Sequence, residues 1–272
     1  MIVDGRAIAA DILSETKERV TRLGIIPVVR AITCEPSPAT VSYLKIKAAR
    51  AEDAGMRLEV VHLPDTANEE DFIAAVKAPG AHAVIVQLPL PLGIDAVRVV
   101  NAIARTQDAD VLSSSAYEAF EAHADQALLP PVVEAIKEVL ERSQVSVSGK
   151  QVVVVGQGKL VGAPAAVWLT SVGARVQVIT RDNDAHAQLQ SADIIVSGAG
   201  SPGLITPEDI TEGVVLIDAG TSEQGGQVVG DAEPSCALKA SVFTPVPGGM
   251  GPVAVACLFR NVATLLERSL QE

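Results

Sequence analysis

Hydrophobic positions along the chain follow two spacings, one typical of amphipathic helices and one of buried strands. In the first half, apolar residues spaced three and four apart alternate with short runs rich in Val and Ile. This order predicts parallel strands joined by helical crossovers. The predicted strands are residues 26–34, 57–64 and 82–91, and the predicted helices are residues 5–24, 38–54, 68–78 and 94–104.

A second α/β series follows a helical pattern at residues 130–143 and a polar, glycine-containing turn at residues 145–151. Its predicted strands are residues 152–155, 174–180, 193–200, 213–220 and 241–246, and its predicted helices are residues 161–173, 185–192 and 252–270. We therefore expect an α/β protein throughout. A length of 272 residues is enough for two domains, with a boundary between residues 120 and 148.

Composition narrows the classes of partner. Aromatic residues make up only 3% of the chain, so the core must consist of Val, Ile, Leu and Ala, as in strands buried on both faces. A net charge of -12 argues against nucleic acid or an anionic membrane as a partner. Three cysteines lie without metal-ligand spacing, so we expect no metal site and a reducing, cytoplasmic location. Neither a signal peptide nor an apolar run of membrane-spanning length is expected.

Glycines follow the first strand of the second series. Gly156, Gly158 and Gly162 lie between that strand and a predicted helix. Glycine allows the backbone to approach a pyrophosphate, and the start of the helix offers free N–H groups to phosphate. The pattern predicts a dinucleotide-binding loop, although glycines also form ordinary tight turns.

The end of the next strand bears on the choice of dinucleotide. An acidic side chain there favours NAD, whereas an arginine accommodates the extra phosphate of NADP. Arg181 and Asp182 are adjacent, so the sequence points both ways; we favour NADP, with NAD as the alternative. Arg181 is equally compatible with an ordinary surface position.

Tyr43 and Lys47 are four residues apart, so they share one face of a predicted helix. The pair is either part of a solvated surface or a proton-handling pair. Short-chain dehydrogenases also use Tyr-x-x-x-Lys, but there the glycine loop comes first. Here the pair precedes the loop by more than a hundred residues, which excludes that family.

Several strings, taken in order, resemble the bifunctional methylenetetrahydrofolate dehydrogenase/methenyltetrahydrofolate cyclohydrolase family. They are "DGRAIAADI", "SPATVSYLKIKAARAEDAG", "IVQLPLP", "VGQGKLVGAP", "ADIIVSGAG", "LIDAG" and "TPVPGGMGPVAVACL". The resemblance covers essentially the whole chain.

The resemblance implies two α/β lobes flanking a cleft, the later lobe with a Rossmann-like parallel sheet. Residues 1–122 would form the folate-binding, catalytic domain, and the C-terminal helix at residues 252–272 would pack back on it. Residues 123–251 would form the dinucleotide-binding domain. Family members are commonly homodimers through that domain, so we expect a homodimer that binds a small folate substrate.

The resemblance also implies roles for particular residues. The expected catalytic residues are Lys47, Tyr43, Gln87 and Asp110, with Lys47 as the acid/base group. The expected folate-binding residues are Tyr43, Leu88, Pro89, Pro247, Gly248 and Gly249. The expected cofactor-binding residues are Gly156, Gln157, Gly158, Gly162, Arg181, Gly198, Ala199, Gly200, Gly220 and Thr221.

Three of these positions also have structural interpretations. Gln87 could satisfy backbone groups at the end of a strand, and Asp110 could be a turn or cap residue. The string at residues 245–252 could be only a rigid turn before a helix.

The sequence departs from the family pattern at three places. The usual Lys-Asp-Val-Asp-Gly is "QDADV" at residues 107–111, with Gln107 in place of the lysine and Val111 in place of the glycine. The usual Pro-Cys-Thr-Pro is "PPVV" at residues 130–133. The usual Gly-Arg-Ser is "GQG" at residues 156–158, which removes groups that often hold the extra phosphate of NADP.

These departures leave three functional hypotheses. The first is a bifunctional enzyme of one-carbon metabolism, which oxidises methylenetetrahydrofolate with NADP and hydrolyses the methenyl product to formyltetrahydrofolate. The second keeps only one of these activities. The third is a nonenzymatic dinucleotide- or folate-binding relative. Retention of Tyr43, Lys47, Gln87 and Asp110 favours the first.

Overall fold

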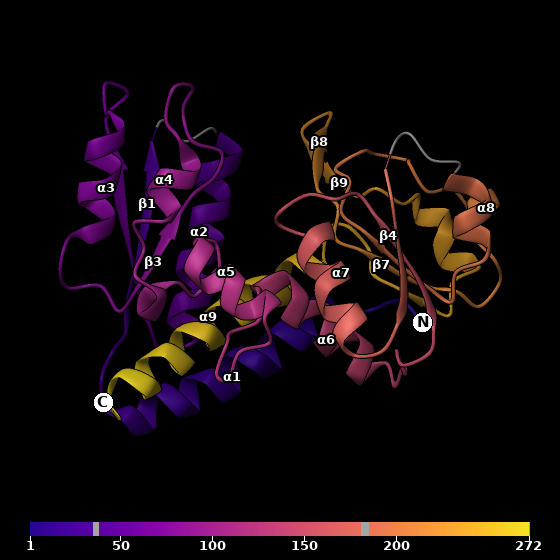
Figure 1. Ribbon diagram of the computed structural model, residues 1–272, viewed down its shortest axis with the longest axis horizontal. Coiled ribbons are helices and arrows are strands. Elements are labelled where there is room, and N and C mark those ends of the chain that lie inside the picture. Colours follow the sequence, from indigo (N-terminus) through magenta and orange to yellow (C-terminus); the bar gives the residue numbers. More distant parts are fainter. Residues whose placement is uncertain (35–37, 181–184, 272) are drawn as a thin grey trace. The chain divides into compact units, whose positions relative to one another are not determined.

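The computed structural model describes residues 1–34, 38–180 and 185–271 (Figure 1). Its contacts divide the chain into two compact units. The N-terminal unit consists of Ala10–Pro131 and Val255–Glu272, and the central unit of Met1–Ala9 and Val132–Ala254. The expected α/β class with parallel sheets is confirmed. The domain limits taken from the sequence stay a prediction.

The N-terminal unit contains a parallel sheet of three strands in the order β2-β1-β3. These strands are β1 (Val28–Cys34), β2 (Arg57–Leu63) and β3 (Ala83–Val86). All of β3, and β1 up to its last residue, are buried. This burial explains the unbroken apolar runs in the sequence, because both faces of a parallel sheet are covered by helices.

Helices pack on this sheet and close its core. They are α1 (Gly5–Leu23), α2 (Pro38–Asp53), α3 (Glu69–Lys77), α4 (Ala96–Val100) and α5 (Ser114–Glu121). The 3₁₀ turn η1 (Arg105–Gln107) lies between α4 and α5. Helix α3 begins at Asn68, whose side chain accepts hydrogen bonds from the backbone of Glu70 and Asp71 in a capping box. Its buried Phe72 and Val76 pack with Ile32 and other core residues of the sheet.

The central unit contains a parallel sheet of five strands in the order β10-β7-β6-β4-β5. Its strands are β4 (Gln151–Val155), β5 (Arg175–Ile179), β6 (Ile194–Ser197), β7 (Val215–Asp218) and β10 (Val242–Phe243). In this sheet β5 lies on one side of β4, and the next strand in the chain, β6, lies on the other side of β4. The order of strands therefore reverses at β4. Ligands of open α/β sheets bind beyond the carboxyl ends of the strands at such a reversal.

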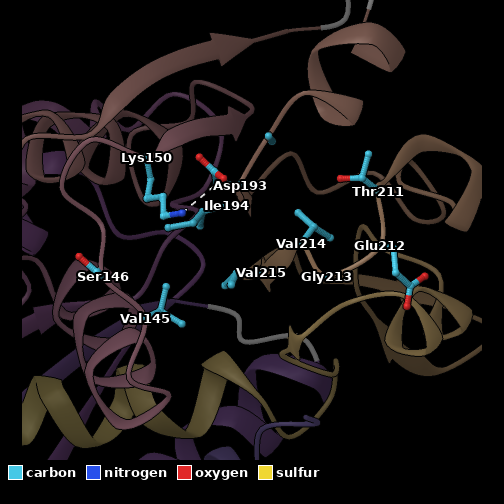
Figure 2. A pocket seen from close by; sticks show the side chains of 11 residues that line it. Val145, Ser146, Lys150, Asp193, Ile194, Thr211, Glu212, Gly213, Val214 and Val215 are labelled. Atoms are coloured by element: carbon cyan, nitrogen blue, oxygen red, sulfur yellow. Dashed lines mark ion pairs between the residues drawn. The ribbon is translucent and has the colours of Figure 1, made fainter.

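The opposite, amino edge of this sheet is hollowed by a pocket of about 340 Å³ (Figure 2). Lys150 and Asp193 line it, and their charged groups lie 3.5 Å apart. They directly precede β4 and β6. Because ligands of such sheets bind at the carboxyl edge, this pocket lies at the wrong edge for the dinucleotide.

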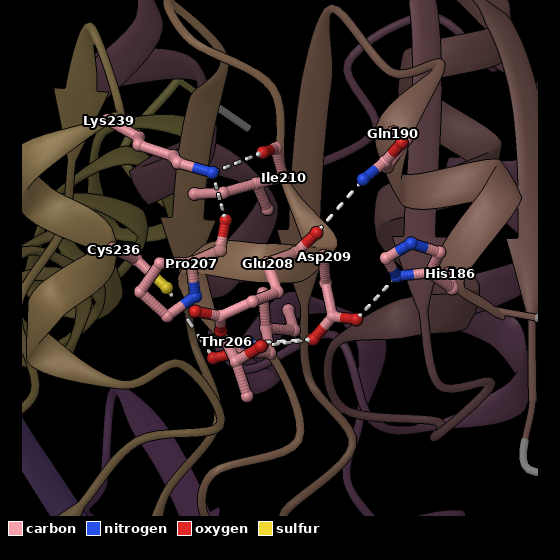
Figure 3. Close-up of polar contacts among 10 residues, drawn as sticks. His186, Gln190, Thr206, Pro207, Glu208, Asp209, Ile210, Cys236 and Lys239 are labelled. Atoms are coloured by element: carbon pink, nitrogen blue, oxygen red, sulfur yellow. Dashed lines mark hydrogen bonds and ion pairs between the residues drawn. The ribbon is translucent and has the colours of Figure 1, made fainter.

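The remaining helices and turns of the central unit are α6 (Pro131–Arg142), α7 (Gly162–Ser171), α8 (Ala185–Gln190), η2 (Pro207–Asp209) and η3 (Pro234–Leu238). Helix α7 packs on β4, β5 and β6. Polar contacts fasten α8 to η2 (Figure 3): Nδ1 of His186 lies 2.9 Å from Asp209, and Gln190 donates to the carbonyl of Glu208. Lys239 also donates to a carbonyl of η2, that of Pro207, at 2.6 Å.

Two elements were not anticipated from the sequence. Helix α5 follows Ser113, which caps it by accepting from the backbone N–H of Ala116. An antiparallel hairpin, β8 (Ser222–Gln224) and β9 (Gln227–Val229), follows β7. Its strands are too short and too polar to show a strand periodicity. Helix α4 is also shorter than the predicted 94–104.

The final helix α9 (Met250–Ser269) is long and apolar enough to cross a membrane by length and composition, contrary to the sequence expectation. However, 67% of its most apolar window is buried inside the protein, as in a core helix. Its later half is fastened within the N-terminal unit by an ion pair from Arg19 to Glu267 at 2.6 Å. Asn261 donates to the carbonyls of Ala109 and Leu129, both at 3.0 Å. The expected packing of the last helix on the N-terminal unit is confirmed.

Replacing the buried Asn261 with leucine should lower the free energy of unfolding by about 1–3 kcal/mol, because two carbonyls lose their hydrogen-bond donor at a buried position. Urea denaturation measures the change. Ser269→Ala is the control, since its hydroxyl bonds only to a carbonyl of its own helix. Equal stability of Asn261→Leu and the control would contradict this account of α9.

Candidate active site and dinucleotide loop

Lys47 is almost fully buried on α2, with only 6% of its surface exposed. The buried Leu44 and Ala51 lie three residues before and four residues after it, so the lysine belongs to the packed stripe of the helix. Its Nζ donates to Oε1 of Gln87 at 3.3 Å and lies 4.8 Å from the centre of the Tyr43 ring. The solvated-surface interpretation of this pair is therefore wrong for Lys47.

Gln87 directly follows β3 and continues the sheet, because its backbone N–H donates to the carbonyl of Ile32 at 2.9 Å. Its side-chain Nε2 donates to the carbonyl of Leu88 at 3.1 Å. With the amide nitrogen held in this way, Oε1 faces Lys47. Gln87 thus does satisfy backbone at a strand end, and the same contact orients it toward the lysine.

Asp110 lies in the loop between η1 and α5, close enough to Lys47 for their charges to interact. The loop is shaped by Asp108, which accepts from the N–H groups of Leu112 and Ser113 and from the Ser113 hydroxyl. Sequence reasoning identified Asp110 but missed Asp108, which is the first acid of the same "QDADV" string. Its role in holding the loop frees the carboxylate of Asp110 for the site.

Burial dominates the electrostatics of this cluster. It lowers the pKa of Lys47, an effect that the negative charge of Asp110 opposes. It raises the pKa of Asp110, with Lys47 acting in the other direction and Asp108 adding to the increase. Burial, together with Asp110, raises the pKa of Tyr43 to about 12. Although 41% of the surface of Tyr43 is exposed, its phenol stays protonated at neutral pH.

The departures from the family pattern find structural explanations here. Gln107, in place of the lysine, donates to the carbonyl of Ala81 at 2.7 Å and fastens the loop to the chain before β3. Val111 adopts a φ of 57°, a left-handed conformation that disfavours side chains and explains a glycine at this position. Burial of the Val111 side chain offsets that cost. In "PPVV", Pro131 begins α6 and Val133 is buried.

The other predicted folate residues divide between the units. Leu88 and Pro89 follow Gln87 in the N-terminal unit, and Pro89 is exposed. Pro247, Gly248 and Gly249 lie in the central unit, directly before α9.

Close packing explains a glycine of the first family string. A Cβ on Gly5 would lie 1.9 Å from the carbonyl oxygen of Gly249. The start of this string at Gly5 is thus packed against the loop at residues 247–249 within the central unit.

The glycine loop connects β4 to α7 and has no room for side chains at two positions. Gly156 has a φ of 93°, and a Cβ there would lie 3.1 Å from Cα of Ala199. A Cβ on Gly162 would lie 2.1 Å from the carbonyl oxygen of Gly156. Helix α7 begins at Gly162 without a side-chain cap. The N–H of Ala163 donates to the carbonyl of Gly158 at 3.1 Å, and Pro164 has no N–H.

Residues after β6 and β7 lie at the same carboxyl edge. The chain at Gly198 and Ala199 packs on the glycine loop, since a Cβ on Gly198 would lie 2.4 Å from the Val161 side chain. Gly200 and Thr221 are exposed, and Gly220 is buried. Gln157 and Gly158 are exposed between β4 and α7. Arg181 lies outside the described residues.

The described part of the chain holds no group of three or more His, Cys, Asp or Glu side chains that could bind a metal ion. The described residues therefore hold two candidate sites: a buried lysine with polar partners in the N-terminal unit, and a glycine loop in the central unit. Together these define an α/β protein with a Rossmann-like dinucleotide domain and a second domain suited to proton transfer.

The family follows from comparison with known proteins. Residues 3–110 match the catalytic domain, and residues 130–270 the NAD(P)-binding domain, of tetrahydrofolate dehydrogenase/cyclohydrolase. The chain belongs to the tetrahydrofolate dehydrogenase/cyclohydrolase family.

Relatives and solved structures match along the whole length. The bifunctional protein FolD of Moorella thermoacetica is 35% identical over 98% of this chain and 99% of that protein. The crystal structure of the Trypanosoma brucei methylenetetrahydrofolate dehydrogenase-cyclohydrolase, complexed with NADP and an inhibitor, is 33% identical. It has a TM-score of 0.94 and matches over 100% of this chain and 99% of that one. The Campylobacter jejuni bifunctional enzyme has 28% identity and a TM-score of 0.94, with 99% of each chain covered.

Gly162→Ala should lower the thermal midpoint of the ligand-free protein by several degrees, because its Cβ would meet backbone at 2.1 Å and cost about 1–3 kcal/mol. Gly158→Ala is the matched control, since a Cβ there has ordinary contact at 3.9 Å. Differential scanning calorimetry measures both. The packing argument fails if the two variants unfold at the same temperature.

Proposed function

We propose that this chain oxidises methylenetetrahydrofolate to methenyltetrahydrofolate with NADP and hydrolyses the product to formyltetrahydrofolate. Membership of the family supports both activities. The observation that carries the assignment to residues is the buried Lys47 in contact with Gln87 and under the influence of Asp110. A nonenzymatic relative would have no need to keep a lysine buried, since burial of an ammonium group costs free energy.

The dehydrogenase step requires two reactants held in contact. The bound dinucleotide supplies the acceptor for the hydride that leaves the methylene carbon. The glycine loop fits such a group, because the exposed Gly158 has no side chain that would stand between its backbone and a bound phosphate. The protein contributes orientation in this step, with Pro247, Gly248 and Gly249 as the proposed folate contacts.

The cyclohydrolase step requires proton transfer, which we assign to Lys47. Water adds to the methenyl carbon and loses a proton, and a ring nitrogen gains a proton as the bridge opens. The lowered pKa of Lys47 increases the fraction of neutral amine at neutral pH, so that it can accept the first proton and return it. Gln87 orients Nζ of Lys47 by its hydrogen bond, and the ring of Tyr43 lies beside Nζ.

Asp110 has a second proposed role. A carboxylate accepts hydrogen bonds from the amino and ring N–H donors of a pterin. Its neighbour Asp108 uses its own oxygens within the loop, which leaves Asp110 for the substrate.

The proposed setting of the enzyme is a cytoplasmic homodimer. This agrees with the family expectation and with Cys34, Cys236 and Cys257, which form no disulfide in the described part of the chain. For NADP over NAD, support comes from the Trypanosoma brucei relative, whose structure contains NADP.

Lys47→Met should reduce cyclohydrolase turnover by about 10²- to 10⁴-fold, because the substitution keeps an unbranched side chain but removes the proton carrier. The measurement follows the loss of methenyltetrahydrofolate absorbance. Lys45→Met is the matched control, since Lys45 is exposed on the same helix. Full cyclohydrolase activity in Lys47→Met would disprove the assignment.

Gln87→Glu should shift the pH profile of cyclohydrolase kcat/KM to higher pH by about one unit or more. A negative charge 3.3 Å from Nζ favours the ammonium form, so the pKa of Lys47 rises and the neutral amine appears only at higher pH. Gln87→Met serves as the uncharged control. An unchanged profile in Gln87→Glu, after subtraction of spontaneous hydrolysis, would remove Lys47 from the role of base.

A further inference from the structure

Asp231 is a fully buried carboxylate at the carboxyl edge of the central sheet, and sequence reasoning assigned it no function. It follows the β8–β9 hairpin and directly precedes the backbone bridge between Ala232 and Ile205. Burial of an ionised carboxylate is costly unless several donors compensate it. The surroundings of Asp231 therefore show what the carboxylate holds in place.

Within the described residues, the Asp231 carboxylate accepts hydrogen bonds from one segment, the end of β6 and the residues after it. Oδ2 accepts from the Ser197 hydroxyl at 2.6 Å and from the N–H of Ala199 at 2.7 Å. Oδ1 accepts from the N–H of Ser201 at 2.6 Å. Three short hydrogen bonds to one carboxylate fix the path of residues 197–201.

The peptide unit between Gly198 and Ala199 connects Asp231 with the glycine loop. Its N–H donates to Asp231, while its carbonyl oxygen faces the loop, 3.1 Å from the place that a Cβ of Gly156 would occupy. Because a peptide unit is planar, a hydrogen bond that holds the N–H also sets the direction of the carbonyl. Asp231 thereby orients an acceptor at the point where the order of strands reverses.

Asp231 also contacts the residue after the neighbouring strand. A Cβ on Gly220 would lie 2.2 Å from Cγ of Asp231, so the carboxylate packs against the backbone after β7. A second buried carboxylate, Asp218, accepts from the N–H groups of Gly220 and Ala232. Burial raises the pKa of Asp218 to about 6, and the nearby Asp231 adds to this increase. The two side chains together lock the hairpin segment to the edge of the sheet.

We propose that Asp231 is a positioning residue for the dinucleotide, which holds the peptide between Gly198 and Ala199 in the orientation that the cofactor requires. It acts through this segment and does not itself contact the cofactor. The proposal rests on dinucleotide binding by the central unit, and it extends the proposed function to a residue outside the glycine loops.

The test is Asp231→Asn, which preserves size but replaces one acceptor oxygen by an amide donor. The KM for NADP in the dehydrogenase reaction and the Kd for NADP from titration calorimetry should both rise by about tenfold to a hundredfold. Cyclohydrolase turnover without dinucleotide should stay within about twofold of wild type, because the proposed proton-transfer residues Lys47 and Gln87 belong to the N-terminal unit. A merely structural role would reduce both activities together.

Ser197→Ala is the milder second variant, since it removes one of the three donors and keeps the carboxylate. It should raise the KM for NADP in the same direction, by several-fold, and it decides the question if Asp231→Asn does not fold. Asp193→Asn is the control: its carboxylate accepts from the N–H of Gln151 at the amino edge of the same sheet (Figure 2). Its KM for NADP should match wild type.

Two results would overturn the proposal. One is a wild-type Kd for NADP in Asp231→Asn or Ser197→Ala. The other is a loss of dehydrogenase and cyclohydrolase activity by the same factor in both of these variants. Failure of the wild-type protein to bind NADP or NAD would instead count against the proposed function itself, so the two failures are distinguishable.

Discussion

Parallel pairing of the strands is the constraint on which both candidate sites depend. When strands run in one direction, all their carboxyl ends meet at one edge, and the residues that follow them become neighbours. In the sheet of the N-terminal unit, Gln87 follows β3. In the separate sheet of the central unit, Gly156 follows β4 and Gly198 follows β6, and the pairing of these two strands brings residues more than 40 positions apart in the sequence together.

Buried charge is the second theme of the structure, and the protein handles it in two ways. Around Lys47, burial and the charge of Asp110 act in opposite directions on the lysine pKa, which keeps a proton exchangeable. Around Asp231, three donors satisfy the carboxylate and hold a backbone segment still. The first arrangement suits the proposed proton transfer, and the second suits the proposed positioning of the backbone. Both bury charge at a cost in free energy.

Most of the helices and strands could be predicted because long apolar periods leave few alternatives. Helix α5 and the β8–β9 hairpin could not, since short polar elements depend on tertiary contacts such as the Asp218 hydrogen bond to Ala232. The site was located through family strings, and four of its residues, Tyr43, Lys47, Gln87 and Asp110, do lie in one unit. Asp108 and Asp231 were missed, because an aspartate in a loop has no periodicity that separates a buried anchor from a surface turn.

The sequence by itself determined the fold class, the family and the residue types that carry the chemistry, because hydrophobic period and glycine spacing are local properties. Only the tertiary structure decided the burial and the hydrogen-bond partners of these residues. Tyr43 and Lys47 share a helix face in any helix, yet burial of the lysine follows from packing of α2 in the N-terminal unit. Likewise, the sequence cannot show that Asp231 reaches the end of β6, 30 or more residues earlier in the chain. Burial and long-range hydrogen bonds arise only when the strands are assembled, and they set both the pKa of a side chain and the path of a loop.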